Sequence, residues 1–322
     1  MPTQPPSKLF DPELAKAQVR PVIEIATPLL KEVLSYGMAL FARCSYRPEG
    51  ADENLAILFI YRHFLEMVDG VSILVAESAP APAALLLRAM LESLLAIDYL
   101  TQDRAQTRSR ALAYLYQVEI KRKRFYLSQD PTTPQGKMFR ELVADDRDSP
   151  KWESTDPAEL AVYIQEIDDL LSTPDFQEIA EEYKRTKKKV GRYPNWYSLY
   201  GGPRNIGQLA KLLDRGAAYA LLYGEWSERT HSADAIDRIL THDRSGPAAR
   251  SLRDATELNA TLDFAIGFAL DAARCLIRYY RPAEEPALNR RYREEISPGW
   301  KRIPKLEVRR PEATKSRTRE RS

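Results

Sequence analysis

The chain has few of the residues that mark disulfide scaffolds, glycine-rich folds or membrane proteins. Its 322 residues include two cysteines and 13 glycines. Cys44 and Cys275 lie far apart on apolar stretches, so we expect buried thiols in a reducing compartment rather than a disulfide. No apolar run approaches the roughly 20 residues of a membrane span, and the polar, proline-rich start does not resemble a signal peptide. We therefore expect a cytoplasmic protein that does not enter a membrane.

Several motifs of known chemistry are also missing. There is no glycine-rich phosphate loop, Cys-x-x-Cys pair or His-Glu-x-x-His sequence. Ser227 and His231 lack the Gly-x-Ser-x-Gly context of a hydrolase nucleophile. The step from Glu228 to His231 is the unit of helical di-iron sites, but such sites need a second step of this kind, and neither His63 nor His242 provides one. We therefore expect no cofactor and no metal ion.

The residues that are abundant favour helices. Ala, Leu, Glu and Arg are plentiful, β-branched runs are scarce, and no two-residue alternation persists. These features predict an all-α fold, a multi-helix bundle built on a central helical hairpin with arms at about 53–77 and 83–103. If the turn is centred near Pro80, residues whose numbers sum to about 161 face each other, and Asp69 lies level with Glu92.

The expected domain organisation is simple. Residues 1–10 form a flexible lead-in, and one all-α domain covers 11–282, starting with Asp11 as the N-cap of a helix that has Pro12 at its first position. A peripheral helical insertion occupies 130–190, with helix starts at Asp156 and Thr173. Helices are also expected at about 216–231 and 233–242. Residues 283–322 form a basic, largely disordered tail, since 287–322 carry 12 Lys and Arg against five Glu.

Two groups of polar residues stand out in apolar helical sequence. Arg88 and Glu92 lie four residues apart within an apolar run, so they can pair along one helix. Later in the chain, polar residues recur at every fourth position, and their tips share one stripe of a helix. This stripe consists of Tyr219, Tyr223, Ser227 and His231. We expect both groups to form one buried cluster whose candidate catalytic residues are His231, Arg88, Glu92, Ser227 and Tyr223.

The cluster has two interpretations. A buried Arg88–Glu92 pair can be a structural ion pair that locks helix packing. Alternatively, the Glu92 carboxylate holds the Arg88 guanidinium ready for an anion. Basic runs at 121–124 and 184–189, the second followed by the aromatic loop 192–200, also have two interpretations. They bind single-stranded nucleic acid, or they form a helix C-terminus that favours positive charge, followed by aromatic side chains that fill the core.

Four sequence pieces in a fixed order resemble a known family. They are Tyr61-Arg-His-Phe-Leu-Glu-Met-Val-Asp69, Leu86-Leu-Arg-Ala-Met-Leu-Glu92, Asn195-Trp-Tyr197 and the stripe Tyr219/Tyr223/Ser227/His231. Over residues of about 50–280, this set resembles a bacterial domain-of-unknown-function family numbered 5677. The resemblance implies a helical, bacterial, intracellular protein and supplies no reaction.

The chain has a looser likeness to the higher-eukaryote-and-prokaryote nucleotide-binding (HEPN) helical domains, many of which are RNases of toxin and phage-defence systems. Those enzymes usually carry Arg, four to six residues and then His, a spacing that neither Arg238 with His242 nor Arg229 with His231 matches. The likeness implies that His231 is the acid–base group and Arg88 the phosphate clamp.

These observations leave two functions open. One is a HEPN-like RNase or nucleotide-binding effector of a defence or toxin system. The other is a non-enzymatic helical sensor or interaction module whose polar cluster is structural. The corresponding partners are RNA or a nucleotide, a second copy of the chain in a homodimer, or an unidentified protein.

Overall fold

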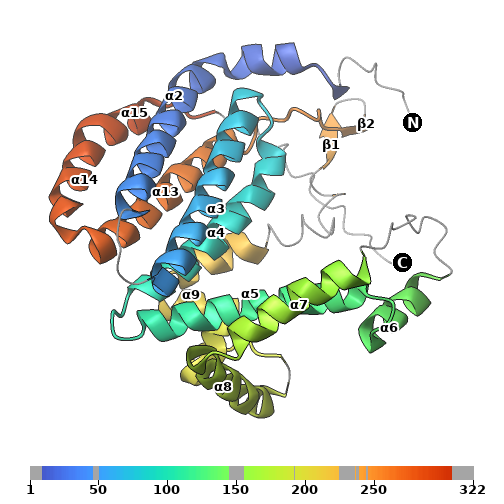
Figure 1. Cartoon of the computed structure of the whole chain (residues 1–322). Coiled ribbons are helices and arrows are strands. Elements are labelled where there is room, and N and C mark those ends of the chain that lie inside the picture. The colour runs from blue at the N-terminus through green and yellow to red at the C-terminus, as the bar shows by residue number, and fades with distance from the viewer. Residues whose placement is uncertain are drawn as a thin grey trace, which may run out of the picture. The chain divides into compact units, whose positions relative to one another are not determined.

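The computed structural model describes residues 9–45, 51–144, 156–191, 193–224, 236, 239–243 and 246–306. Helices dominate these residues (Figure 1), which confirms the all-α fold class and a multi-helix bundle. The helices are α2 (Pro12–Ser45), α3 (Ala51–Ala76), α4 (Pro80–Thr101), α5 (Thr107–Gln129), α6 (Pro134–Val143), α7 (Pro157–Leu171), α8 (Pro174–Val190), η1 (Trp196–Gly201), α9 (Ile206–Leu212), α10 (Gly216–Ala218), η2 (Tyr219–Tyr223), α13 (Leu258–Tyr280), η3 (Pro282–Glu284), α14 (Glu285–Arg291), η4 (Tyr292–Ile296) and α15 (Ser297–Arg302).

Contacts group the chain into two compact units. Unit 1 consists of Met1–Tyr46, Ile60–Asp98 and Ala217–Ser322, and unit 2 consists of Arg47–Phe59 and Tyr99–Gly216. Unit 2 is larger than the insertion expected at 130–190, because it also takes in α5 and the segment that follows α8. The expectation of a single domain over 11–282 stays a prediction.

In unit 1, α2 begins where the sequence predicts. The Asp11 carboxylate accepts a hydrogen bond from the Leu14 N–H at 2.9 Å, and Pro12 is the first helical residue. The helix continues through Pro21 and Pro28 and packs against α13. Within the described ranges, α2 is the one helix long and apolar enough to cross a membrane, and a core helix of a soluble protein passes the same test.

The hairpin of α3 and α4 has a tighter turn than expected. Ser78 adopts the left-handed conformation (φ 53°), and its N–H bonds to the Val75 carbonyl while the Ala79 N–H bonds to that of Leu74. These two bonds form a Schellman motif, which ends a helix in one residue of left-handed backbone. The turn is therefore centred near Ser78 rather than Pro80.

This turn also corrects the expected register within unit 1. A Cβ built on Gly70 would lie 2.8 Å from the Leu86 Cδ1, so opposite residues have numbers that sum to about 156 rather than 161. Asp69 therefore lies about level with Leu87 and not with Glu92. The error is about 7.5 Å along the axis, more than one helical turn, and arises because serine does not signal a left-handed turn.

The C-terminal part of unit 1 corrects two further expectations. Residues 285–302 are helical and bury Leu288 and Ile296, so much of the expected disordered tail packs on the unit; residues 307–322 lie outside the description. The Trp300 Nε1 also donates to Asp263 of α13 at 2.6 Å.

The prediction of a helix at 233–242 is wrong at its C-terminal end, where β1 (Leu240–Asp243) pairs antiparallel with β2 (Gly246–Ala249). Ladder hydrogen bonds replace helical ones there.

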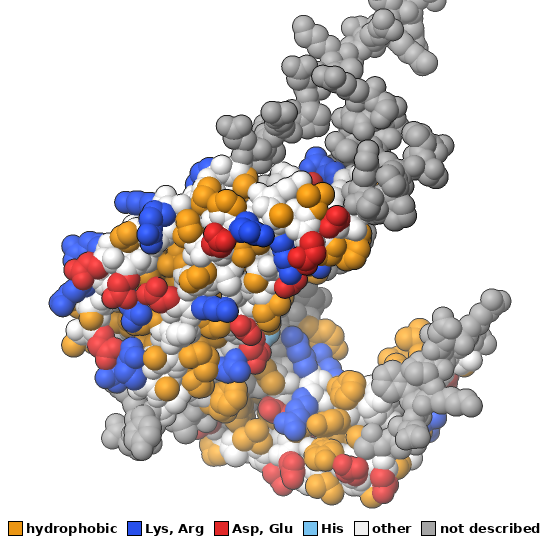
Figure 2. All heavy atoms as spheres, turned by 90° about the horizontal axis from the view of Figure 1, so that it is seen from above, with side chains coloured by type: hydrophobic (Ala, Val, Ile, Leu, Met, Phe, Trp, Pro, Cys, Tyr) orange, Lys and Arg blue, Asp and Glu red, His pale blue; other side chains and the backbone are white. Residues whose placement is uncertain are grey.

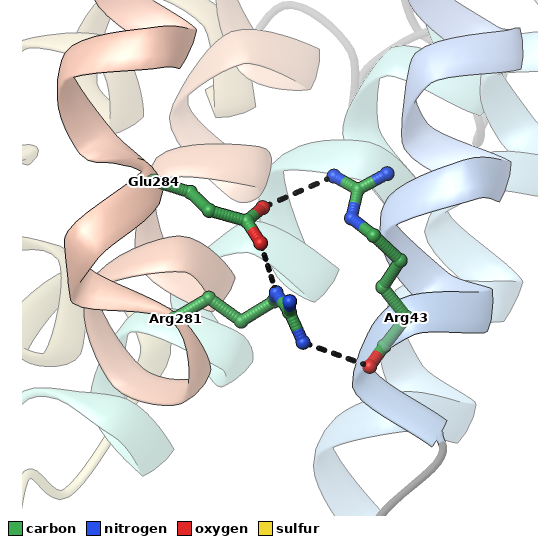
Figure 3. Close-up of polar contacts among 3 residues, drawn as sticks. All are labelled: Arg43, Arg281 and Glu284. Atoms are coloured by element: carbon green, nitrogen blue, oxygen red, sulfur yellow. Dashed lines mark hydrogen bonds and ion pairs between the residues drawn. The ribbon is translucent and has the colours of Figure 1, made fainter.

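A small ionic network ties the end of α2 to the end of α13 (Figure 3). The Glu284 carboxylate accepts from the Arg43 Nη2 at 3.3 Å and pairs closely with the Arg281 Nε. The Arg281 Nη1 in turn donates to the Arg43 carbonyl at 3.4 Å. Cations near helix C-termini are favourable because carbonyl groups there lack intrahelical partners. The network therefore fixes both helix ends. Of the two cysteines in unit 1, Cys44 is buried, as expected, whereas Cys275 is only partly buried.

Unit 2 has a core of its own. Helices α7 and α8 begin at the predicted positions; the Asp156 side chain accepts from the Ala158 N–H at 2.9 Å, and α8 starts at Pro174. Both helices pack against α5. The shared cluster of buried side chains consists of Leu112, Ala113, Tyr116, Phe176, Ile179 and Leu199. Within unit 2, α8 therefore contributes to a core, although its sequence looks polar on most faces.

Candidate functional site

The structure brings three of the five candidate residues together in unit 1. Arg88 and Glu92 are four residues apart on α4, and the Arg88 Nε donates to the Glu92 Oε1 at 3.1 Å. The Arg88 Nη2 donates to the hydroxyl of Tyr223, in η2, at 2.8 Å. The Arg88 guanidinium carbon also lies 4.5 Å from the centre of the Tyr223 ring. One arginine is thus held by a carboxylate and by a phenol from a distant part of the chain.

The cluster is less buried than the sequence predicts. The Arg88 side chain is 23% exposed and that of Glu92 is 42% exposed. The apolar sequence around Arg88 and Glu92 predicted full burial, but a helix can be apolar on more than one face and still present a polar edge to solvent. The structural interpretation, which depends on a fully buried ion pair, therefore loses its main premise.

Electrostatic interactions within the cluster keep Arg88 and Tyr223 in their ordinary protonation states at neutral pH. Burial opposes the charge of Arg88, but the hydrogen bonds to Glu92 and Tyr223 outweigh burial, so the pKa of Arg88 is raised. Burial also raises the pKa of Tyr223, and the negative charge of Glu92 raises it further. Arg88 is therefore a permanent cation, and Tyr223 keeps its proton.

The tyrosines lie on an unusual turn. Tyr219–Tyr223 forms a π-helix rather than the α-helical turn that the sequence predicts. The two rings stack with centroids 4.7 Å apart and planes inclined by 22°. Single π turns occur often at functional sites, and the stacked rings place a flat aromatic group beside the guanidinium.

Two candidate residues lie outside the described part of the chain. Ser227 and His231 belong to the segment 225–235, which the structure does not describe. The expected convergence of His231 with Arg88 and Glu92 therefore stays a prediction, as does any catalytic role of Ser227. Glu228, the acidic member of the Glu-x-x-His step, also falls in this segment.

The described geometry is suited to holding an anion. A guanidinium oriented by a carboxylate has its planar donors fixed in direction, and such donors match phosphate or carboxylate oxygens. Figure 2 shows Lys and Arg interspersed with Asp and Glu over the face that it draws, so no broad field of one sign dominates that face. Among the described residues, no group of three or more His, Cys, Asp or Glu could hold a metal ion.

Unit 2 contains a polar cavity that the sequence did not predict. Its volume is about 420 Å³, and it is lined by Tyr99, Arg110 and Trp196, among others. The Arg110 guanidinium carbon lies 3.9 Å from the centre of the Tyr99 ring, and Trp196 packs against Tyr99 with centroids 5.7 Å apart. Trp196 also contacts the buried core, which favours the core-filling interpretation of this part of the aromatic loop. No local sequence pattern links these residues.

One of the comparisons with known proteins matches the part of the chain that contains the cluster. No curated protein and no solved structure gives a significant match to the chain. The model of a protein family described as "Family of unknown function (DUF5677)" matches residues 54–247, more than half of the chain. This range contains Arg88, Glu92 and Tyr223, together with Ser227 and His231. The chain therefore belongs to the family of unknown function DUF5677.

Proposed function

We propose that the Arg88–Glu92–Tyr223 cluster binds a phosphate group of RNA or of a nucleotide, and that the protein is a HEPN-like effector of a defence or toxin system, acting in the cytoplasm. In this proposal Arg88 is the phosphate clamp, and His231 is the acid–base group of an RNA-cleaving site, assisted by Ser227. The stacked rings of Tyr219 and Tyr223 offer a flat surface for a base.

One observation carries the proposal. The Arg88 side chain is fixed from two sides by Glu92 and Tyr223 and is nevertheless 23% exposed. A guanidinium that is positioned in advance loses little conformational entropy when it binds an anion. The tyrosine partner also comes from the segment that leads directly into Ser227 and His231, only a few residues along the chain.

The alternative is a non-enzymatic helical sensor or interaction module. The observation that favours it is that Arg88 already pairs with Glu92 and Tyr223 inside the cluster, so the three groups stabilise the approach of η2 to α4 without any ligand. In that case loss of Glu92 weakens the fold, because Arg88 is left in a half-buried place without its carboxylate.

The chain contains its own matched control for a test. Arg62 and Glu66 on α3 form the same four-residue pair, also with 3.1 Å between guanidinium and carboxylate. No tyrosine contact of Arg62 appears among the described residues. We expect Arg88→Met to weaken binding of a fluorescent nucleotide or short RNA by about tenfold or more, since a hydrogen-bonded charge contributes about 1.5–3 kcal/mol. Arg62→Met should change binding by less than about twofold.

A second pair of variants separates chemistry from stability. His231→Gln should abolish cleavage of bulk RNA and leave the melting temperature within a few degrees of the parent. Glu92→Ala should weaken nucleotide binding and lower the melting temperature by only a few degrees. If Arg88→Met and Arg62→Met bind equally well, the phosphate-binding proposal fails. If the parent cleaves no RNA and both His231→Gln and Glu92→Ala are strongly destabilised, the cluster is structural.

A further inference from the structure

Two basic runs that are about 60 residues apart in the sequence meet at one exposed aromatic ring of unit 2. Tyr193 follows α8, and its side chain is 60% exposed. The Arg124 guanidinium carbon of α5 lies 4.4 Å from the centre of the Tyr193 ring, and the Lys187 ammonium nitrogen of α8 lies 4.2 Å from it. Cation–π contacts at these distances are attractive. The ring therefore brings two cations together that would otherwise repel each other.

The helices around this ring carry further cations on the same faces. Lys121 precedes Arg124 by three residues on α5, and Lys184 and Lys188 flank Lys187 on α8, so spacings of three and four place these side chains on common faces. We call the set the Tyr193 patch. Its residues are Lys121, Arg124, Phe125, Lys184, Lys187, Lys188 and Tyr193, all exposed.

The patch is not neutralised by neighbouring carboxylates. Two other basic residues of these helices are paired with carboxylates: Lys123 with Asp168 and Arg185 with Glu182. Among the residues that the structure describes, none of the five cations of the Tyr193 patch has a carboxylate oxygen within 4 Å. The positive charge of the Tyr193 patch is therefore not cancelled by carboxylates in the described part of unit 2.

Favourable placement at a helix C-terminus accounts for only part of this arrangement. The last turn of α8 contains Lys187, Lys188 and Lys189, which interact well with the unpaired carbonyl groups there. That effect falls off within one turn, so it does not account for Lys184. It also does not account for Lys121 and Arg124, which belong to another helix.

An exposed aromatic side chain accompanies the charges. Phe125 is 56% exposed, and it lies four residues after Lys121 on the same face of α5. Its ring also contacts that of Tyr126, with centroids 6.0 Å apart and planes inclined by 56°. Phosphate-binding cations beside an exposed aromatic ring are the combination with which proteins bind single strands: cations contact the backbone, and bases stack on the ring.

We propose that the Tyr193 patch binds single-stranded nucleic acid, with its five cations on the phosphates and Phe125 stacked against a base. The proposal goes beyond the Arg88 cluster and does not depend on it, because the patch lies wholly within unit 2 and the cluster within unit 1. It assigns a strand-holding surface, and no covalent step is required there.

The salt dependence of binding tests the charges. We expect the full chain to bind a 20-nucleotide single-stranded RNA in fluorescence anisotropy, with an affinity that falls steeply as salt rises. Each neutralised phosphate contributes about −0.7 to the slope of log K against log salt. The triple variant Lys121→Gln/Lys184→Gln/Lys188→Gln should make the slope shallower by about 2 and weaken binding about tenfold or more. The control Lys31→Gln/Lys137→Gln/Lys211→Gln removes three exposed lysines elsewhere and should change neither.

The ring tests the class of ligand. Phe125→Ala should weaken RNA binding at least about fivefold, because stacking contributes about 1–3 kcal/mol per base. It should leave binding of inorganic polyphosphate unchanged, since that chain has charges but no bases. Equal slopes in the two triple variants would overturn the proposal, as would equal loss of RNA and polyphosphate binding in Phe125→Ala. Tighter binding to phosphatidylserine vesicles than to RNA would assign the patch to a membrane surface instead.

The same variants keep this surface distinct from the Arg88 site. Variants of the Tyr193 patch should leave binding of a mononucleotide unchanged, because a mononucleotide has too few phosphates to span the patch. Arg88→Met should weaken mononucleotide binding and leave the salt slope for the long strand within about 1 unit. Failure of either proposal therefore shows in a different measurement.

Discussion

Replacing Glu182 should be among the most destabilising single changes in unit 2. This glutamate of α8 is buried, with 5% of its surface exposed. Its carboxylate accepts from the Tyr200 N–H and from the Thr186 hydroxyl, each at 2.8 Å, and from the Arg185 Nε at 2.6 Å. Tyr200 adopts the left-handed conformation (φ 55°), which is costly for a bulky residue. Glu182 thus anchors a strained turn to α8.

The magnitude follows from these contacts. A hydrogen bond to a charged group contributes about 1.5–3 kcal/mol, and a buried donor that loses its acceptor costs about 1–3 kcal/mol. Glu182→Ala should therefore lower the free energy of unfolding by about 3 kcal/mol, allowing for partial access of water to the freed groups. Glu182→Gln keeps an oxygen acceptor and loses the charge, so the expected loss is about 1–2 kcal/mol.

The pH dependence has a definite sign. Burial raises the pKa of Glu182, but the hydrogen bonds from Thr186, Tyr200 and Arg185 outweigh it, and the net pKa is lowered. The unfolded chain binds the proton with an ordinary pKa of about 4.3. The stabilisation is therefore complete above that pH and is lost as the pH falls through the lower folded value. The Gln variant should lack this part of the acid sensitivity.

Urea denaturation between pH 3 and 7 measures both effects, and hydrogen exchange at the Tyr200 amide reports the local contact. A loss below about 1 kcal/mol in Glu182→Ala would refute the reasoning. So would an Ala variant and a Gln variant of equal stability, because the acceptor oxygen would then be irrelevant. The exposed Glu178, on the same helix, is the matched control, and Glu178→Ala should change stability by less than about 0.5 kcal/mol.

Three further changes test other parts of the fold. Ser78→Gly should stabilise the chain by about 1 kcal/mol in thermal melting, because it relieves a left-handed serine and removes a buried hydroxyl that lacks a partner among the described residues; a lower melting temperature would contradict this. Gly202→Ala should destabilise unit 2 by several kcal/mol, since its Cβ would lie 2.1 Å from the Tyr197 carbonyl oxygen, and an unchanged urea midpoint would show that the turn adapts. Asp156→Ala should cost about 1 kcal/mol through the lost cap on the Ala158 N–H, while Asp156→Asn, which still caps, should cost less than half as much.

The parts of the fold that depend on local chemistry could be predicted from the sequence. The start of α2 at Asp11-Pro12 and that of α7 at Asp156-Pro157 follow from capping and from the fixed φ of proline, which involve only neighbouring residues. The turn at Ser78 could not be predicted, because the left-handed region usually calls for glycine. The strand β1 was also missed, since a four-residue ladder depends on its partner strand more than on its own residues.

The candidate site was predicted in part. Helical spacing pointed to the Arg88–Glu92 pair and to Tyr223, and the structure joins these three. Spacing could not give the exposure of the pair, because exposure depends on which neighbouring helix covers each face. The contacts of Arg124 and Lys187 with Tyr193 could not be predicted, since nothing in either basic run specifies that α5 and α8 pack together.

The π turn at Tyr219–Tyr223 changes how residues are spaced around the helix. An α-helix advances by about 100° per residue, and a π turn accommodates one residue more than an α turn. Deleting one residue here, such as Leu221, would restore an α-helical turn, because a π turn is what one extra residue produces in an α-helix. A lineage that lost this residue would keep the turn helical, but its two tyrosines would be three residues apart instead of four. An alignment of such a sequence with this one would need a one-residue gap between Tyr219 and Tyr223.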